Sequence, residues 1–316
     1  MIKGKSLLSL MEFSTKEVFE VIELSEKLKE KRKHEVYPPL LKNRTLASIF
    51  MKPSTRTRIS FNEAMHELGG HSIDLTSNEL QLGRGETIED TAKVLSRYVE
   101  VIAARVFAHD DVMKLSKAAT VPVINSLSDL YHPCQILADL QTIKEKKGKL
   151  RDLKLTYIGD GNNVCNTLLI GGALVGMDVY IGCPPDFKPH KDAIKFAQET
   201  AEKTKNKIMI LEDPKEAVKD ADVIYTDTFV SMGAEKEKEG RLKIFLPKYQ
   251  VNKKLVENAK NDFIFMHCLP AHRNQEVTDG VIDSVNSVVF DEAENRLHVQ
   301  KAILCLLLLQ EMEIKI

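Results

Sequence analysis

The feature that most constrains this chain is a repeated alternation of short apolar runs with longer helical segments. Short apolar runs bounded by turn residues are typical of buried strands, and strands alternating with helices favour parallel sheets. The expected strands lie at 46–51, 72–75, 101–104, 121–124, 155–158, 178–181, 207–211, 223–226, 263–266 and 288–290. The pattern therefore predicts an α/β fold with two doubly wound parallel-sheet domains.

Chain length and one helical run predict where the two domains meet. A chain of 316 residues is too long for one ordinary core. A helical run over 132–147 separates the halves and ends at Gly148, a residue typical of helix C-caps. We expect a first domain over 1–147 and a second over 148–316, joined by this helix. The terminal helix, 298–316, is expected to pack back on the first domain.

Composition narrows the class of protein. A formal net charge of -1 argues against general nucleic-acid binding. The apolar run at 302–309 is far shorter than the roughly 20 residues that span a bilayer, and the N-terminus has no signal-peptide pattern. Five scattered cysteines show no metal-type spacing. We expect a cytoplasmic protein that binds no membrane, nucleic acid, metal or cofactor.

The densest chemical motif lies where the first strand meets a helix. Ser54, Thr55, Arg56 and Thr57 follow an apolar run and precede an amphipathic segment. Free N–H groups and the positive end of the helix dipole favour an anion at such a position, and Arg adds a fork of donors that fits phosphate or carboxylate. This turn is expected to bind a small phosphorylated molecule.

Other polar clusters also follow predicted strands. Ligands of parallel α/β sheets bind beyond the carboxyl ends of the strands. The residues at these ends are Arg105, His132 to Gln135, Asp160 to Asn163, Asp227, and His267 with Cys268. A neutral His132 or the Gln135 amide can polarise a carbonyl, although His132 is equally suited to capping its helix. The loop at 81–87 is either a ligand-contacting flap or a surface loop.

The second half of the chain favours a polar substrate over a dinucleotide. Residues 159–164 resemble a phosphate loop, but Val164 replaces the third glycine of the dinucleotide fingerprint, so we discount NAD. Asn163 suits a polar substrate, Asp227 an ammonium, and Ser231 a carboxylate. Cys268 is interpreted as a ligand contact, because adjacent residues of a strand face opposite ways and His267 is poorly placed to activate it.

Four motifs, in this order, resemble the aspartate/ornithine carbamoyltransferase family. They are Ser-Thr-Arg-Thr-Arg at 54–58, His-Pro-Cys-Gln at 132–135, Asp227 with Ser-Met-Gly at 231–233, and His-Cys-Leu-Pro at 267–270. The last two are of the ornithine type. The resemblance implies transfer of the carbamoyl group from carbamoyl phosphate to the δ-amine of L-ornithine. Direct amine attack through a tetrahedral intermediate would give citrulline and phosphate.

The resemblance also implies roles for individual residues. Carbamoyl phosphate would be bound by Ser54, Thr55, Arg56, Thr57, Gln81, Arg105, His132, Gln135, Cys268, Leu269 and Arg296. Gln81 would come from a neighbouring subunit of a homotrimer. Ornithine would be bound by Asn163, Asp227, Ser231 and Met232. Cys268, Arg105 and His132 would act in catalysis. Rival acceptors are putrescine, N-acetylornithine and aspartate, and a Rossmann-type oxidoreductase is the rival from another class.

One departure from the family pattern lies just before the Ser-Met-Gly motif. Phe229 stands where many members carry Trp. Both are large apolar aromatic side chains, so we expect little consequence.

Overall fold

The computed structural model describes residues 2–80, 85–231, 233, 235–314 and 316. The chain divides into two compact units, one formed by Met1–Gln141 with Glu294–Ile316 and the other by Thr142–Ala293. The division falls at 141/142, inside the predicted linking helix, whereas the sequence prediction set the boundary at 147/148. Two helices, α5 (Pro133–Lys147) and α12 (Val289–Leu308), contribute residues to both units.

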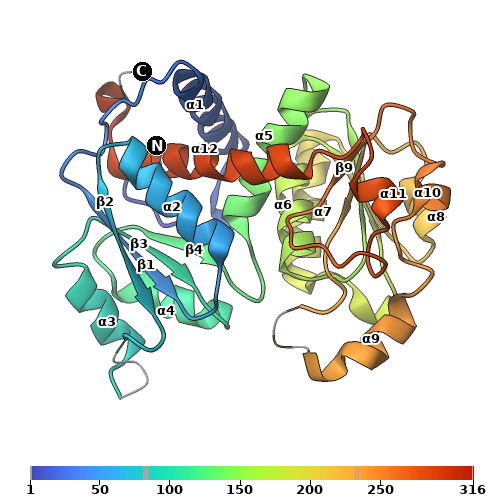
Figure 1. The fold of residues 1–316 in the computed structure, drawn as a ribbon, viewed down its shortest axis with the longest axis horizontal. Helices are drawn as coiled ribbons and strands as arrows, with labels where there is room; N and C mark the ends of the chain where they lie inside the picture. The colour runs from blue at the N-terminus through green and yellow to red at the C-terminus, as the bar shows by residue number, and fades with distance from the viewer. Residues whose placement is uncertain (1, 81–84, 232, 234, 315) are drawn as a thin grey trace. The chain divides into compact units, whose positions relative to one another are not determined.

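The first unit contains a four-stranded sheet and the helices that cover it (Figure 1). Besides α5 and α12, its elements are η1 (Leu10–Glu12), α1 (Thr15–Lys33), β1 (Thr45–Phe50), α2 (Thr55–Glu67), β2 (His71–Thr76), α3 (Ile88–Leu95), β3 (Val101–Arg105), α4 (His109–Ala118), β4 (Val123–Leu127) and η5 (Glu311–Glu313). The strand order is β2-β1-β3-β4, and the pairings are parallel.

Hydrophobic and ionic contacts order the helices of the first unit. Helices α3 and α4 pack on one face of the sheet over a core that includes Ala47, Ile102 and Val112. Helices α1, α2 and α12 meet at the buried carboxylate of Glu67, which binds Arg32 at 2.6 Å and Lys301 at 2.6 Å. After β1, the chain adds β2 on one side of that strand and then β3 and β4 on the other side. The switch point of the sheet therefore lies between β1 and β3.

The second unit contains a five-stranded sheet. Its elements are β5 (Lys154–Ile158), α6 (Asn163–Val175), β6 (Asp178–Gly182), η3 (Pro185–Phe187), α7 (Lys191–Thr204), β7 (Ile208–Leu211), α8 (Pro214–Val218), β8 (Val223–Thr226), η4 (Glu235–Glu237), α9 (Lys238–Phe245), α10 (Lys253–Val256), β9 (Ile264–Met266) and α11 (Asp279–Ile282). The strand order is β7-β6-β5-β8-β9, again with parallel pairings and with a switch point between β5 and β8.

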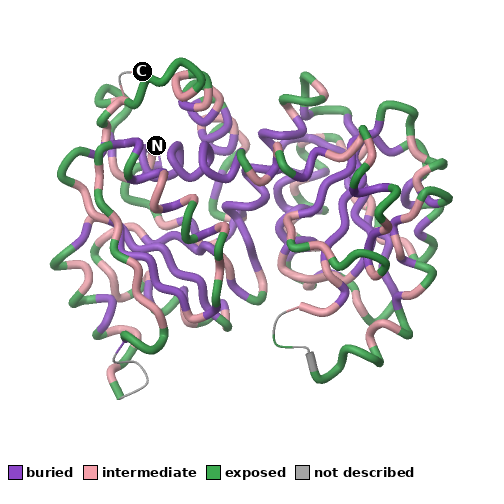
Figure 2. Tube along the Cα trace, in the orientation of Figure 1, coloured by how far each residue is buried: buried purple, intermediate pink, exposed green. Residues whose placement is uncertain are grey.

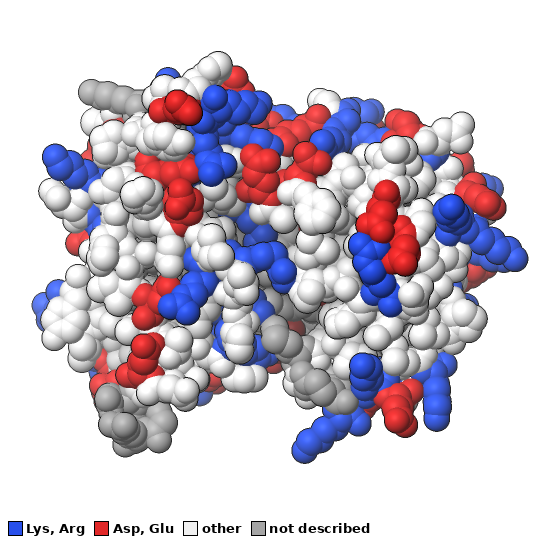
Figure 3. Space-filling view, in the orientation of Figure 1, with Lys and Arg blue, Asp and Glu red and all other residues white. Residues whose placement is uncertain are grey.

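The inner strands β3 and β8 are buried along their whole length (Figure 2). In the second unit, the core includes Phe229, which stacks on Phe245 with ring centroids 4.6 Å apart. Phe229 is fully buried, so the residue that replaces the family's Trp serves as core packing. On the face shown in Figure 3, basic and acidic side chains are interspersed over each unit.

The predicted fold class is confirmed, and one predicted strand is wrong. Residues 288–290 were expected to form a strand, but α12 begins at Val289, nine residues before the predicted start of the terminal helix. Ser287 makes one isolated bridge to Phe265, and the chain then enters the helix. An apolar run of three residues does not distinguish a strand from the buried first turn of a helix.

Local signals account for several helix starts. Ser14 caps α1 and forms a reciprocal capping box with Glu17, while Ser54 caps α2. Gly148 follows α5 with a φ of 72°, the left-handed conformation that glycine adopts without steric cost. Of the helices in the described part of the chain, none has the length and apolar character needed to cross a bilayer.

Candidate active site

The phosphate-binding turn predicted at 54–57 lies at the carboxyl end of β1, beside the switch point of the first sheet. The Ser54 side chain accepts a hydrogen bond from the Thr57 N–H at 3.3 Å and so begins α2. Thr55 is exposed, Arg56 is half-buried and Thr57 is buried. The turn therefore combines a helix N-terminus with a guanidinium, the arrangement that suits a phosphate.

Three further predicted residues gather beside this turn. Arg105 ends β3, the strand next to β1, and is 6% exposed. Arg296, on α12, donates from Nη2 to the Thr57 hydroxyl at 2.7 Å. His132 immediately precedes α5 and is 4% exposed. Residues more than two hundred positions apart in the sequence thus form one cationic cluster.

Electrostatics sets the protonation state of His132. Its burial, together with the positive fields of Arg296, Arg105 and Arg56, holds the pKa of the imidazole well below its usual range. His132 is therefore neutral at physiological pH. A neutral imidazole keeps one N–H, which can donate to a carbonyl oxygen and stabilise the negative charge that develops on it.

Gln135 lies one turn into α5, wholly buried, and its Nε2 donates to Asp139 Oδ1 at 2.8 Å. Cys134, between His132 and Gln135, is a buried residue that we do not expect to contact a ligand. Its thiol contacts the Asn125 carbonyl at 3.7 Å, and burial raises its pKa to about 12. Cys134 is therefore a core residue, whereas His132 and Gln135 carry the polar groups of the motif.

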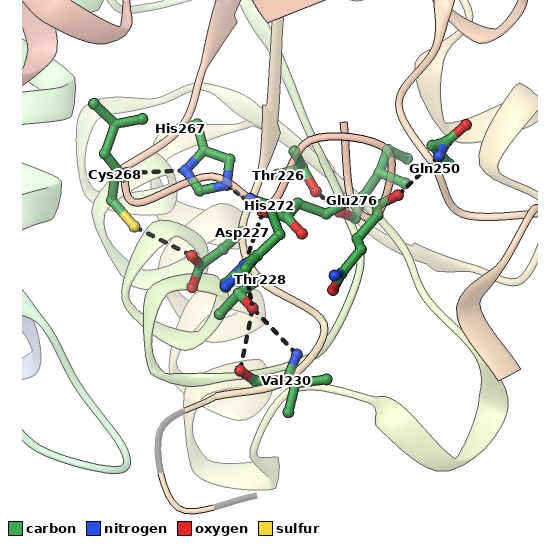
Figure 4. Close-up of polar contacts among 12 residues, drawn as sticks. Thr226, Asp227, Thr228, Val230, Gln250, His267, Cys268, His272 and Glu276 are labelled. Carbon is green, nitrogen blue, oxygen red and sulfur yellow. Dashed lines mark hydrogen bonds and ion pairs between the residues drawn. The ribbon is translucent and has the colours of Figure 1, made fainter. Parts of the chain in front are cut away.

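The second polar cluster lies at the switch point of the second sheet and is centred on Asp227 (Figure 4). Asp227 follows β8 and is 7% exposed. One carboxylate oxygen accepts from Asn162 Nδ2 at 2.7 Å, and the other accepts from the Cys268 thiol at 3.3 Å. Asn163, predicted to bind substrate, begins α6 next to Asn162 and is half-buried.

His267 does not pair with the neighbouring thiol. Its Nδ1 accepts from the Leu269 N–H at 2.9 Å, and its Nε2 lies 3.2 Å from Glu276 Oε1. Both ring nitrogens of His267 are thus engaged in ordering the loop after β9, where Leu269 has a φ of 56°. Cys268 is half-buried and faces Asp227, as a ligand contact requires.

Asp227, His267 and Cys268 also carry potential metal-ligand atoms. These atoms lie within 4.8 Å of one another. A metal bound there through His267 would have to displace the hydrogen bond to Leu269 or the contact with Glu276. The His267 geometry thus fits a loop-ordering role better than metal ligation.

A half-buried ion pair joins two segments of the second cluster. Arg241, on α9, bonds to Asp160 and donates from Nε to the Phe229 carbonyl at 2.6 Å. It therefore links the turn after β5 to the segment that leads to Ser231, which is half-buried. Burial raises the pKa of Asp160 to about 6, against the opposing effect of Arg241.

The glycine loop after β5 does not leave room for a dinucleotide phosphate. A Cβ added at Gly161 would lie 2.3 Å from the backbone carbon of Lys188, and the Gly161 N–H already donates to the Phe187 carbonyl at 2.9 Å. In a dinucleotide fold, the second glycine allows close approach of the pyrophosphate. Here the protein's own backbone occupies that approach, which argues against the oxidoreductase alternative.

Sequence reasoning missed two polar residues of the second cluster. Asn162 was passed over in favour of Asn163, although its position as the N-cap of α6 was a readable signal. Arg241 follows a charged run at 235–239, and no local pattern identifies it. Two predicted residues, Gln81 and Met232, lie outside the described residues.

The fold and these clusters define a class of protein. Each unit is a doubly wound α/β domain with polar side chains collected at its switch point, where such sheets bind ligands. The first collection is cationic and suits a phosphorylated ligand. The second presents a carboxylate, an amide and a thiol, and suits an amine.

The chain belongs to the aspartate/ornithine carbamoyltransferase family. Residues 5–145 match the family's carbamoyl-P binding domain, and residues 151–307 match its Asp/Orn binding domain. The chain is 56% identical over 307 residues to the ornithine carbamoyltransferase of Pyrococcus horikoshii, covering 97% of this chain and 96% of that protein. It is 52% identical over 310 residues to that of Archaeoglobus fulgidus, covering 98% and 99%.

Solved structures agree with this assignment. The ornithine carbamoyltransferase of Pyrococcus furiosus is similar with a TM-score of 0.94 and 54% identity, over 97% of this chain and 98% of that one. The anabolic enzyme of Campylobacter jejuni is similar with a TM-score of 0.89 and 41% identity, over 95% and 98%. The predicted family resemblance is therefore confirmed.

Proposed function

We propose that this protein transfers the carbamoyl group of carbamoyl phosphate to the δ-amine of L-ornithine, forming L-citrulline and phosphate. The observation that carries the proposal is the presence of both clusters in one chain. The first unit has a cationic cluster that suits a phosphate, and the second unit has an Asp227-centred cluster that suits an amine. Family membership over the whole chain and the names of the similar proteins support the same reaction.

In this proposal, the first unit binds the carbamoyl donor. The N-terminus of α2, with Ser54, Thr55, Arg56 and Thr57, binds the phosphate. Arg105, His132 and Arg296 donate to the carbonyl oxygen, which becomes an oxyanion when the amine attacks. Loss of one such donor typically lowers the rate by about 10²–10³. Gln135 contacts the carbamoyl amide.

The second unit binds the acceptor. Asp227 holds the α-ammonium of ornithine, with Asn163, Ser231 and Met232 contacting its α-amino and α-carboxylate groups. Cys268 and Leu269 contact the carbamoyl group near the attacking amine. The Asn162 and Cys268 contacts keep the Asp227 carboxylate in one orientation, which supports its role as an ammonium ligand.

The reaction needs a neutral amine and a stabilised oxyanion. The δ-nitrogen attacks the carbonyl carbon, the carbonyl electrons move to oxygen, and the C–O bond to phosphate then breaks. The departing phosphate accepts the proton lost by the amine. Positioning two reactants in this way typically contributes several kcal/mol.

The direct test is citrulline formation from carbamoyl phosphate and L-ornithine by the folded protein. We expect one phosphate to be released per citrulline formed. L-Aspartate, putrescine and N-acetyl-L-ornithine should be at least about tenfold poorer acceptors, because each lacks the δ-amine, the α-carboxylate or the free α-ammonium of ornithine. Absence of citrulline, or an equal rate with another acceptor, would overturn the proposed function or its acceptor.

We also propose a cytoplasmic homotrimer in which Gln81 completes a neighbouring subunit's site. Subunit mixing tests this arrangement. Gln81→Ala and Arg56→Ala proteins, each inactive alone, should regain activity when mixed and reassociated, because mixed trimers contain sites that carry neither substitution. Persistent inactivity of mixed trimers, verified by two different affinity tags, would contradict a shared site.

A further inference from the structure

Asp139 is a buried carboxylate to which the proposed reaction assigns no role. It lies on α5, one turn after Gln135, and is fully buried. Its Oδ1 accepts the hydrogen bond from Gln135 Nε2 at 2.8 Å. Burying a carboxylate is costly unless its oxygens are hydrogen-bonded. This contact therefore constrains the Gln135 amide as much as it stabilises Asp139.

The chemistry of the two side chains decides which end of the amide faces Asp139. An ionised carboxylate accepts hydrogen bonds and donates none, whereas an amide has a donor nitrogen and an acceptor oxygen. In the structure, Nε2 of Gln135 faces Asp139. Asp139 lies toward the C-terminal end of α5, and His132 lies at its start. With Nε2 bound to Asp139, Oε1 is the atom of the Gln135 amide that can accept a hydrogen bond from a ligand.

We infer that Asp139 is a specificity-determining positioning residue, which holds the Gln135 amide so that Oε1 accepts a hydrogen bond from the –NH2 of the carbamoyl donor. The inference rests on the proposed function. A ligand with an oxygen anion in place of –NH2 would meet Oε1, acceptor against acceptor. Turning the amide to relieve that repulsion would set its oxygen against the Asp139 carboxylate.

Two stable probes separate these cases. Phosphonoacetamide carries a phosphonate, a carbonyl and an –NH2, whereas phosphonoacetate carries an oxygen anion in place of the –NH2. The wild-type protein should bind the amide more tightly. In Asp139→Asn, the side chain at position 139 can donate as well as accept, so the Gln135 amide can turn and donate to phosphonoacetate. The ratio of the two dissociation constants should fall by about tenfold or more.

Two double variants separate amide orientation from simple charge. Gln135→Leu/Asp139→Asn has the charge of Asp139→Asn but no amide to turn, so its ratio should not fall as far. Gln135→Glu/Asp139→Asn keeps the wild-type charge. In that variant, the amide introduced at position 139 donates to one oxygen of the carboxylate introduced at position 135, and the other oxygen remains an acceptor. This variant should retain the preference for phosphonoacetamide. If Asp139→Asn fails to fold, this charge-preserving variant still tests the inference.

Calorimetric titration of both probes measures the ratio, which does not depend on the active fraction of a preparation. An unchanged ratio in Asp139→Asn, an equal fall in Gln135→Leu/Asp139→Asn, or loss of the preference in Gln135→Glu/Asp139→Asn would overturn the inference. Wild-type protein is assayed for citrulline in parallel. Failure of that assay concerns the proposed function, whereas an active wild type with an unchanged ratio refutes the role of Asp139 alone.

Discussion

Asp227 shows how single residues acquire their roles from partners elsewhere in the chain. The sequence identified it as a carboxylate at a strand end, which many surface turns also have. Its burial and its contacts with Asn162 and Cys268 distinguish it from those turns. A buried carboxylate held by an amide and a thiol keeps one orientation, which supports the proposed role of Asp227 as an ammonium ligand.

Replacing Asp227 by Ala should impair use of ornithine without affecting the carbamoyl donor. A hydrogen bond to a charged group contributes about 1.5–3 kcal/mol, so kcat/KM for ornithine should fall about 10- to 100-fold or more. Steady-state kinetics checks this, with carbamoyl phosphate affinity measured separately. Asp262→Ala is the control, because Asp262 is an exposed carboxylate of the same unit. Unchanged kinetics in Asp227→Ala would refute the assigned role.

Replacing Arg56 by Ala should abolish measurable carbamoyl phosphate binding while the protein remains folded. Arg56→Lys should restore only part of the affinity, since an ammonium cannot reproduce the planar fork of a guanidinium. Calorimetric titration measures both variants. Arg97→Ala, at an exposed position of the same unit, is the control and should bind normally. Wild-type affinity in Arg56→Ala would rule out the proposed phosphate turn.

Among the elements, the turn after β5 depends most strictly on a small residue. Gly161 packs directly against the backbone of Lys188 and Pro189, so any side chain at position 161 would force the turn away from the segment before α7. The same turn holds Asn162, the cap of α6 and a ligand of Asp227. Its geometry therefore links backbone packing to the position of the Asp227 carboxylate.

Two glycine substitutions should have opposite effects on stability. Gly161→Ala forces a Cβ to within 2.3 Å of the Lys188 backbone and should destabilise the protein by at least about 1–3 kcal/mol. Gly240→Ala, at an exposed position of α9 with nothing within 4 Å, should be neutral or stabilise by about 0.5–1 kcal/mol. Denaturant unfolding measures both, and equal effects would contradict this account of Gly161.

For the whole molecule, the two units supply different chemistry. The first surrounds His132 with guanidiniums, and the second presents Asp227. The pH dependence of turnover should therefore report the amine rather than the imidazole, because His132 is already neutral throughout the working range.

The rate with ornithine should accordingly rise with pH. An amine of pKa about 10.4 is mostly protonated at neutral pH, so kcat/KM should increase about tenfold per pH unit from roughly pH 6.5 to 9. The pKa of His132 lies well below 6.5, so this residue should contribute no acid limb in that window. A break near pH 6.5 that disappears in His132→Asn would contradict the neutral imidazole.

Local patterns were sufficient for much of the fold. The α1 helix over Thr15–Lys33 and its Ser14 cap follow from apolar periodicity and capping chemistry, which act between near neighbours. The strands β1, β3, β5 and β8 follow from apolar runs that parallel sheets bury on both faces. The strand predicted at 288–290 was wrong because a three-residue run carries no periodicity, and α12 begins at Val289.

The order of residues along the chain determined the fold class, the family and the strand ends where polar groups collect, because turn chemistry, periodicity and motif spacing are local properties. The tertiary structure alone decided which distant groups meet. Arg296 contacts Thr57, Asn162 donates to Asp227, and Arg241 bonds to Asp160. These contacts depend on how helices pack on sheets, and the burial that gives each contact its energy exists only after folding.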